Sequence, residues 1–315
     1  MDLGFALPVS GAWSSAESVR LVARRAEALG YASLWTFQRL LHPVRADWSA
    51  TYVSVQDPVV TLAHAAALTQ RVRLGVAVLN APYVPPLVLA KQLTTLDVLS
   101  DGRLDVGLGL GWAAEEFEAV NVPRAERVGR TVETVECLRA IWGPDPVRFE
   151  GTYVNVPEAI VQPKPVQQPH PPLLMGGSVP AALERVGRLA DGWVSSSRQD
   201  LRRVGQDIDT VRTAAERAAR DPGVLRFVVR GVVRLGSEIS DRDGRRRLLT
   251  GSIDQVQQDL DTLGEQGVTE VFVDPNFSPD VVSPTVEPAR SLGTALELLE
   301  RLAPPIGPPG SETST

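Results

Sequence analysis

The chain alternates between short, continuously apolar runs and longer stretches in which apolar residues recur every three or four positions. The short runs are typical of parallel strands covered on both faces, since such strands need no alternation of polar and apolar residues. Eight are predicted, at residues 3–7, 32–36, 72–79, 104–109, 172–175, 192–195, 226–234 and 269–273. The chain is therefore expected to form a mostly parallel sheet.

Between these runs, apolar residues follow the period of an amphipathic helix. Ala16, Val19 and Val22 share one face of a first helix that ends at Gly30, and Leu292 begins the same pattern in a last helix. Short connections between strand and helix favour right-handed parallel units. Eight such units, with no break in composition at mid-chain, favour a closed (β/α)8 TIM barrel over the alternative, a doubly wound open sheet.

Two segments exceed a minimal barrel. Residues 144–171, after the fourth helix, predict a hairpin around Glu150-Gly151 followed by a proline-rich extended stretch. Residues 235–251, after the seventh strand, are polar and glycine-rich and predict a mobile loop. We expect one barrel domain over residues 1–303 and a disordered tail over residues 304–315, which have no apolar period.

Composition narrows the classes of function. Of 315 residues, 43% are hydrophobic and 22% are charged, as in an ordinary soluble globular protein. The formal net charge of −6 comes without a long basic run, which argues against nucleic acid as a partner. No apolar run approaches the roughly 18 residues of a membrane span. The single cysteine, Cys137, cannot form an internal disulfide, which fits the reducing cytoplasm.

The residues that follow the strands carry the candidate chemistry, because barrel active sites lie at the carboxyl ends of the strands. These segments are rich in aromatic and amide side chains, and they hold neither the paired acids of a glycosidase nor a nucleophile beside a histidine. With three histidines and one cysteine, a Cys/His zinc site is excluded, and we assign no metal ligand. His42 alone follows a strand closely enough to act as an acid or base. Such a pocket suits a large, flat, conjugated ligand that supplies its own chemistry.

The segment Gly176-Gly177-Ser178 gives the sharpest local signal. Two glycines let the backbone approach a ligand, Ser178 is placed to cap the following helix, and Pro180 suits its first turn. The free N–H groups at such a helix start bind anions, which predicts a phosphate site. The alternative is that the glycines only make a tight turn.

Glycines also fill the end of the fourth predicted strand, where Gly107, Gly109 and Gly111 precede Trp112. Their spacing is GxGxG, which differs from the GxGxxG dinucleotide fingerprint. Glycines inside a strand more often admit a bulky neighbour or a ligand, so we assign Gly109, Gly111 and Trp112 to a cofactor pocket. Three carboxylates that follow are expected to complement the dipole of a helix: Glu115, Glu116 and Glu118.

Together, the motifs resemble the bacterial luciferase-like superfamily of flavin and deazaflavin oxidoreductases, and within it the F420-dependent branch. The resemblance covers about residues 3–275, and it is more specific for the superfamily than for cofactor or substrate. It rests on Arg73-Leu74-Gly75, Leu89-Ala90-Lys91-Gln92, Thr95-Leu96-Asp97, Leu99-Ser100-Asp101-Gly102-Arg103, the glycines before Trp112, Pro163-Lys164-Pro165 and Ala190-Asp191-Gly192-Trp193.

The resemblance implies a TIM barrel that holds coenzyme F420, or FMN as the alternative, at its carboxyl face. In relatives, a bulge in strand three with a non-prolyl cis peptide supports the back of the cofactor ring, and the matching pair here is Ala77-Val78. Asn80 matches a position that contacts the ring. Gly176, Gly177 and Ser178 match the segment whose backbone binds the cofactor phosphate, in agreement with the prediction from the local pattern.

This chain also departs from its relatives. Many deazaflavin relatives carry Asp-His after strand two, where the histidine takes part in substrate chemistry, and here the positions hold Gln38 and Arg39. A relative that oxidises a sugar phosphate uses a glutamate after strand four, where this chain has Trp112, so that reaction is not expected. Arg39 stays cationic and can hold an anion but cannot shuttle protons. Gln38, Arg39 and His42 are the candidate catalytic residues.

The first hypothesis is an F420-dependent oxidoreductase that moves a hydride between the cofactor and a small organic substrate, under a hydrophobic lid of Trp13, Trp112 and Phe277. The second is an FMN-dependent luciferase-like monooxygenase. The third, prompted by the missing Asp-His pair, is a flavin-binding protein without catalysis. A cationic exit is expected for the longer anionic tail of F420, from Arg39, Arg45 and Arg198. We expect a homodimer, and the substrate cannot be read from the fold.

Overall fold

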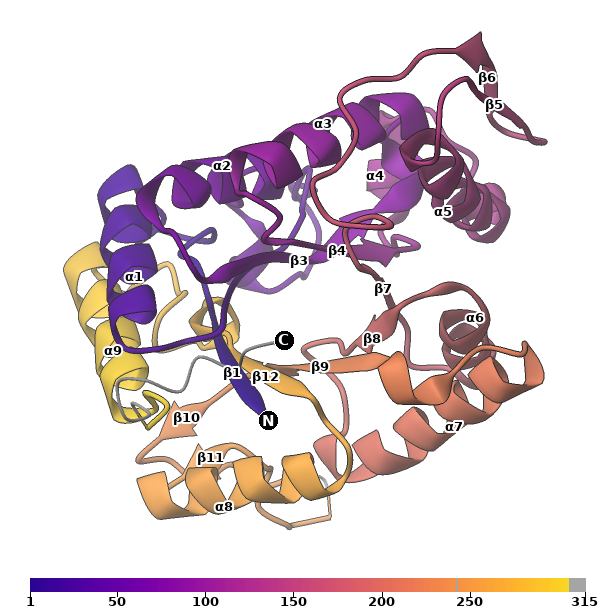
Figure 1. Ribbon diagram of the computed structural model, residues 1–315. Coiled ribbons are helices and arrows are strands. Elements are labelled where there is room, and N and C mark those ends of the chain that lie inside the picture. Colours follow the sequence, from indigo (N-terminus) through magenta and orange to yellow (C-terminus); the bar gives the residue numbers. More distant parts are fainter. Residues whose placement is uncertain (242, 306–315) are drawn as a thin grey trace.

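A computed structural model describes residues 1–241 and 243–305. Eight parallel strands close into a barrel in the order β1-β12-β9-β8-β7-β4-β3-β2, with helices around it (Figure 1). The barrel strands are β1 (Asp2–Ala6), β2 (Ser33–Thr36), β3 (Arg73–Asn80), β4 (Leu104–Gly109), β7 (Leu173–Gly176), β8 (Gly192–Val194), β9 (Arg226–Gly231) and β12 (Glu270–Val273). All eight predicted strands are confirmed, and closure rules out the open sheet.

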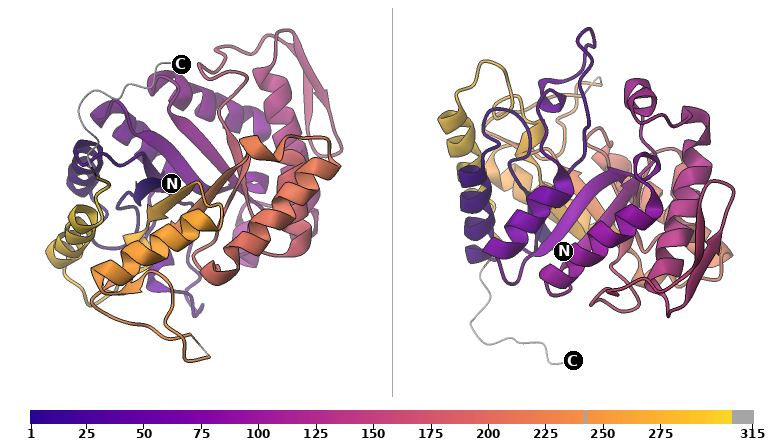
Figure 2. Two further views of the ribbon diagram at one scale, coloured as in Figure 1. Left: turned by 60° about the horizontal axis from the view of Figure 1, so that its bottom comes forward. Right: turned by 90° about the horizontal axis from the view of Figure 1, so that it is seen from above.

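The helices surround the strands in all three views (Figures 1 and 2). They are α1 (Ala16–Ala28), α2 (Pro58–Leu68), α3 (Pro86–Leu99), α4 (Ala114–Ala119), α5 (Arg127–Trp142), α6 (Pro180–Leu189), α7 (Val204–Arg217), α8 (Ile253–Glu265) and α9 (Pro288–Arg301). Capping side chains fix several starts: Ser15 accepts from the Ser18 N–H at α1, and Ser252 and Gln255 form a capping box at α8. Within the two described segments, no helix combines the length and apolarity needed to cross a membrane.

The two insertions lie outside the barrel. The expected hairpin is present: β5 (Val147–Glu150) pairs antiparallel with β6 (Asn155–Ala159), and it projects beyond α5 (Figure 1). In the second insertion, β10 (Arg234–Leu235) pairs parallel with β11 (Thr250–Gly251), so the strand predicted over residues 226–234 is split after Gly231. The expected disordered tail lies outside the described residues, apart from its first two positions.

Large side chains fill the barrel interior beneath its carboxyl end. The rings of Trp35 and Phe272 stack with centroids 5.0 Å apart. Trp35 lies directly over Gly75, because a Cβ atom at that glycine would overlap the indole ring. Ala77 and Val194 belong to the same buried cluster and close it from above. The interior of the barrel is therefore filled by side chains, and any ligand must lie between this layer and the carboxyl end of the barrel.

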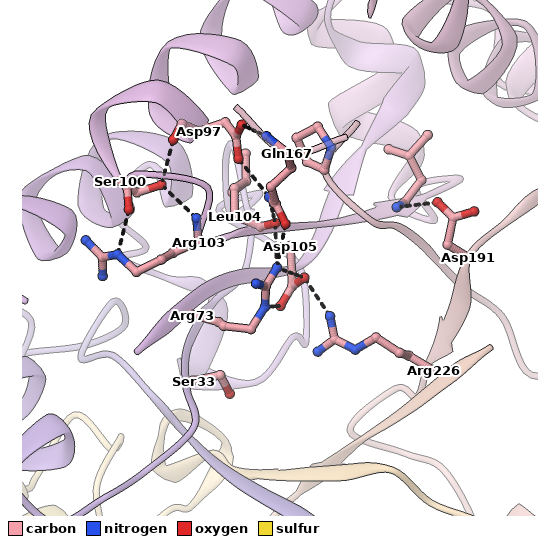
Figure 3. A network of polar contacts seen from close by, with 12 residues as sticks. Ser33, Arg73, Asp97, Ser100, Arg103, Leu104, Asp105, Gln167, Asp191 and Arg226 are labelled. Atoms are coloured by element: carbon pink, nitrogen blue, oxygen red, sulfur yellow. Dashed lines mark hydrogen bonds and ion pairs between the residues drawn. The ribbon is translucent and has the colours of Figure 1, made fainter. Parts of the chain in front are cut away.

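Buried charges hold the opposite, amino end of the barrel (Figure 3). The Asp105 carboxylate, which is fully buried, accepts hydrogen bonds from Arg73 and Arg226, each at 2.6 Å. Arg226 also pairs with Glu270 at 2.9 Å. Nearby, Asp97 at the end of α3 accepts from the backbone N–H of Val166 at 2.7 Å and so ties the proline-rich insertion to the barrel. These groups lie at the strand starts, where barrels carry stability more than chemistry.

Candidate active site

A cavity of about 390 Å³ opens at the carboxyl ends of the strands. The sequence-predicted residues come together in its wall, with His42 as the exception. These wall residues are Gln38, Arg39, Ala77, Val78, Asn80, Gly109, Gly111, Trp112, Gly176, Gly177 and Ser178. Four further side chains complete much of the lining: Phe37, Tyr52, Arg230 and Phe277. The strand ends thus place one apolar and aromatic pocket where barrel enzymes carry their active sites.

A bulge in β3 forms one wall. The register between β3 and β4 shifts between Val76 and Leu79, and the Ala77-Val78 peptide is cis, as the family resemblance implied. The strand glycines of β4 make room for this bulge, because a Cβ atom at Gly107 or Gly109 would overlap the backbone of Val76 or the side chain of Val78. Of the two uses considered for these glycines, the structure shows the admission of a bulky neighbour.

The segment after β7 forms a second wall, and its two glycines have different surroundings. A Cβ atom at Gly176 would lie 3.6 Å from Val78 Cγ1, an ordinary contact on the cavity side. At Gly177 it would lie only 2.6 Å from the Cβ atom of Ala182 in α6. The absence of a side chain at Gly177 therefore lets the segment after β7 pack closely on α6. Gly177 also lines the cavity, and a role of its backbone in cofactor binding stays a prediction.

The start of α6 faces the cavity. Its N-cap is Val179, so the prediction that Ser178 caps the helix is wrong by one residue, whereas Pro180 does occupy the first turn. Val179 offers no side-chain acceptor, and in the described part of the chain the cap makes no side-chain hydrogen bond. Pro180 has no N–H, and the N–H groups of Ala182 and Leu183 donate to the Val179 carbonyl. This turn therefore offers an anion the Ala181 N–H and the positive end of the helix dipole.

Arg39 is held by a buried carboxylate. Its Nη1 atom lies 2.9 Å from Glu116 Oε2, and the two side chains are 6% and 0% exposed. Glu116 also accepts from the Leu40 N–H at 2.7 Å and from the Tyr83 hydroxyl at 3.1 Å. Glu116 lies in the first turn of α4, where it was expected to complement the helix dipole, and it also anchors the loop after β2. Burial and the negative charge of Glu116 raise the pKa of Tyr83 above its ordinary value, which keeps its hydroxyl a donor.

Aromatic rings surround the Arg39 guanidinium at the cavity mouth. Its Cζ atom lies 4.6 Å from the Trp112 ring centroid and 4.8 Å from that of Tyr52. Trp112 is 46% exposed, and Phe277 completes the aromatic side. Trp13, in contrast, is only 1% exposed and does not line the cavity, so it is not part of the lid that we expected.

Of the other two candidate catalytic residues, Gln38 lies in the cavity wall and His42 does not. Gln38 is buried in the wall, and its Oε1 atom accepts from the backbone N–H of Asn80 at 2.8 Å, which fixes the end of β3. His42 lies outside the lining and packs edge-on against Trp48, with ring centroids 5.5 Å apart. Its buried Nε2 atom has no partner within residues 1–241 and 243–305. A role of His42 in the reaction stays a prediction.

Sequence reasoning missed the buried pair Arg230 and Asp274. Arg230 Nη1 lies 2.7 Å from Asp274 Oδ2, and Nη2 donates to the carbonyl of Ala77 in the bulge. Burial raises the pKa of the Asp274 carboxyl, and the neighbouring guanidinium opposes that rise. A signal was available: an arginine inside a continuously apolar strand must find a buried partner.

A second cavity of about 620 Å³ adjoins the first and shares Ser197 and Arg230 with it. Its other cationic lining residues are Arg198, Arg202, Arg245 and Arg247, accompanied by Asp200, Asp241 and Asp243. Of the arginines expected at an exit, Arg198 lies here, Arg39 is neutralised by Glu116, and Arg45 is exposed on the loop after β2. No cluster of three or more His, Cys, Asp or Glu side chains that could hold a metal occurs among the residues described.

Comparison with known proteins places this chain among the luciferase-like monooxygenases. The profile of the luciferase-like monooxygenases matches residues 3–270. An FMNH2-dependent dimethylsulfone monooxygenase of Pseudomonas putida is 34% identical over 180 residues, which are 55% of this chain and 49% of that enzyme. The crystal structure of the monooxygenase RslO1 from Streptomyces bottropensis has a TM-score of 0.77 at 26% identity and covers 96% of this chain and 98% of its own. An F420-dependent secondary alcohol dehydrogenase shares the fold, with a TM-score of 0.74, 18% identity and coverage of 92% of this chain and 96% of its own.

Proposed function

Because the chain belongs to the luciferase-like monooxygenase family, we propose that it is an oxidoreductase that uses coenzyme F420 to transfer a hydride to or from a small organic substrate. The observation that carries the choice of F420 is the arginine-lined cavity beside the candidate active site. F420 and FMN share a tricyclic ring and a ribityl phosphate, but F420 continues into a longer anionic tail. That tail needs a cationic path away from the barrel mouth.

The residues present fit such a cofactor. Gly176 leaves space against Val78 where a side chain would narrow the cavity. The uncapped start of α6 at Val179 suits a phosphate. Arg230 has a buried Nε atom in the cavity wall with no partner among the described residues, and a ligand acceptor would satisfy it. When bound, the cofactor supplies the hydride-transfer chemistry, and the protein supplies binding and orientation.

Gln38 and Arg39 shape the wall of the site, where they help to orient the ligand and to exclude water. Gln38 is engaged with the Asn80 backbone, and Arg39 is engaged with Glu116. Neither is placed to move a proton, because an arginine stays protonated and an amide does not titrate. The aromatic side, with Tyr52, Trp112 and Phe277, faces where a substrate enters and favours one that is apolar or aromatic in part.

Titration of the purified apoprotein with F420 and with FMN tests the cofactor. We expect F420 to bind more tightly at low salt and the difference to narrow as salt rises, because exposed ion pairs are screened. Replacing Arg198 and Arg247 by Gln should weaken F420 and leave FMN unchanged. Arg217→Gln, on α7 outside both cavities, serves as the control. Tighter FMN binding at every ionic strength contradicts the proposal.

That outcome would favour the second candidate, an FMN-dependent luciferase-like monooxygenase. The observation in its favour is the 34% identity to an FMNH2-dependent monooxygenase over 180 residues. Consumption of oxygen with reduced FMN would identify it. A flavin-binding protein without catalysis remains the third alternative, and steady turnover with any acceptor removes it.

We also propose a homodimer that buries the outer faces of α2 and α3. These packed helices expose apolar side chains that a monomer would leave in water: Val60, Leu87, Val88, Val98 and Leu99. Grouped apolar exposure of this kind marks an interaction surface. Light scattering after size exclusion should give twice the 34.0 kDa of the chain, and Leu99→Glu should shift the mass toward the monomer.

A further inference from the structure

The pair Arg230 and Asp274 joins three parts of the barrel. Arg230 is in β9, Asp274 directly follows β12, and the Ala77 carbonyl that accepts from Arg230 belongs to the β3 bulge. The two side chains are 6% and 1% exposed. Asp274 is fixed in turn by Asn276, whose side-chain and backbone N–H groups donate to Oδ1 at 2.9 and 3.1 Å. The guanidinium therefore has one defined position beneath the candidate site.

Aromatic rings enclose that guanidinium. The ring centroids of Phe277, Phe272 and Phe37 lie 4.7, 5.2 and 5.6 Å from its Cζ atom. Such rings exclude water and strengthen the interactions of the cation with whatever lies beside it. The Nε–H is nevertheless buried without an acceptor in the described segments. A buried donor of this kind is costly unless a ligand accepts from it.

Of the two charged side chains in the pair, only the positive one borders the cavities. Arg230 lines both the candidate active site and the arginine-lined cavity, whereas Asp274 lines neither. The positive end of the pair thus faces the ligand, and the negative end points into the protein. A ligand that rests on Ala77 and Val78 meets Arg230 at the same time, because the guanidinium is bonded to the Ala77 carbonyl.

We propose that Arg230 is a cofactor-contacting cation that binds the reduced ring more tightly than the oxidised one. The inference rests on the proposed function. Addition of a hydride brings two electrons and one proton, so the reduced ring carries one more negative charge than the oxidised ring unless a further proton is taken up. Arg230 offers that charge a fixed hydrogen-bond donor and a positive field, and it needs no proton transfer of its own.

A purely structural role makes a different prediction. If Arg230 only holds the bulge through the Ala77 carbonyl, its loss should weaken both redox forms of the cofactor equally. Because Arg230→Met leaves the buried Asp274 without its partner, the double variant Arg230→Met/Asp274→Asn is the main test, since it removes both charges together. Arg230→Lys keeps the charge, and Arg226→Lys, at the amino end of the same strand, is the matched control.

The measurements are anaerobic fluorescence titrations of oxidised and reduced F420, repeated with FMN, and the midpoint potential of the bound cofactor. In the double variant we expect the ratio of reduced to oxidised affinity to fall about tenfold, the size of one hydrogen bond to a charged group. For a two-electron couple this lowers the midpoint potential by about 30 mV. Arg226→Lys should leave the ratio unchanged, and thermal melting should show a folded protein throughout.

The outcomes separate the two proposals. An equal loss of both redox forms, or no loss, overturns the role of Arg230 while the native protein still binds its cofactor. A reduced-form preference measured with FMN alone supports Arg230 and overturns the choice of F420. If the native protein binds neither cofactor in either redox state, both proposals fail.

Discussion

The buried pair between Arg39 and Glu116 offers a sharp test of how the mouth of the site is built. Arg39→Met keeps much of the side-chain volume and removes the charge. Glu116, which is 0% exposed, would then hold a negative charge with only the Leu40 N–H and the Tyr83 hydroxyl as donors. We therefore expect the variant to be destabilised by the carboxylate left behind more than by the lost contact.

The structure sets the size of the effect. Breaking a buried ion pair from one side costs about 3–5 kcal/mol, and the two remaining donors place this pair near the lower end, at about 3 kcal/mol. Replacing both partners, as in Arg39→Met/Glu116→Gln, is expected to cost about 1 kcal/mol or less, because no buried charge remains. The coupling energy, which is the sum of the two single-variant costs minus the cost of the double variant, should therefore exceed about 2 kcal/mol, because Glu116→Gln alone also leaves a buried charge without its partner.

Urea unfolding followed by far-ultraviolet circular dichroism measures these differences, since tryptophan fluorescence would report the nearby Trp112 as well as global unfolding. The exposed pair Arg301 and Glu297, with side chains 45% and 64% exposed, is the control. It should show a coupling energy of about 0.5 kcal/mol or less. A coupling energy at Arg39 and Glu116 no larger than in this control would refute the reasoning.

Three further predictions follow from single contacts. Gly176→Ala should fold normally and weaken cofactor binding, as measured by titration. Gly177→Ala should lower Tm, because its Cβ atom would lie 2.6 Å from that of Ala182. Equal Tm values for the two variants would contradict this packing role of Gly177. Burial raises the pKa of the Cys137 thiol to about 11, so at pH 8 it stays protonated and should react with a thiol reagent only as fast as the protein unfolds. Asp97→Asn should destabilise the chain by about 1–3 kcal/mol, since Asp97 accepts from the Val166 N–H, and leave cofactor affinity unchanged.

Local pattern was enough to predict the barrel. Continuously apolar runs flanked by helical periodicity indicate strands covered on both faces, and this property depends only on neighbouring residues. For the same reason Gly30 and Ser252 mark helix boundaries correctly, since a cap is made within one turn. The wall of the cavity was also largely predictable, because the strand order brings the segments after the strands to one face whatever their spacing in sequence.

Tertiary structure alone decided which of these residues are engaged and with what. Arg39 and Glu116 are 77 positions apart, and Arg230 meets the Ala77 carbonyl across 153 positions. Their pairing depends on the register of strands, the bulge in β3 and the direction of each side chain, and none of these is encoded within one segment. Burial makes this pairing necessary, because a buried charge without a partner of opposite charge or hydrogen bonds costs several kcal/mol of stability.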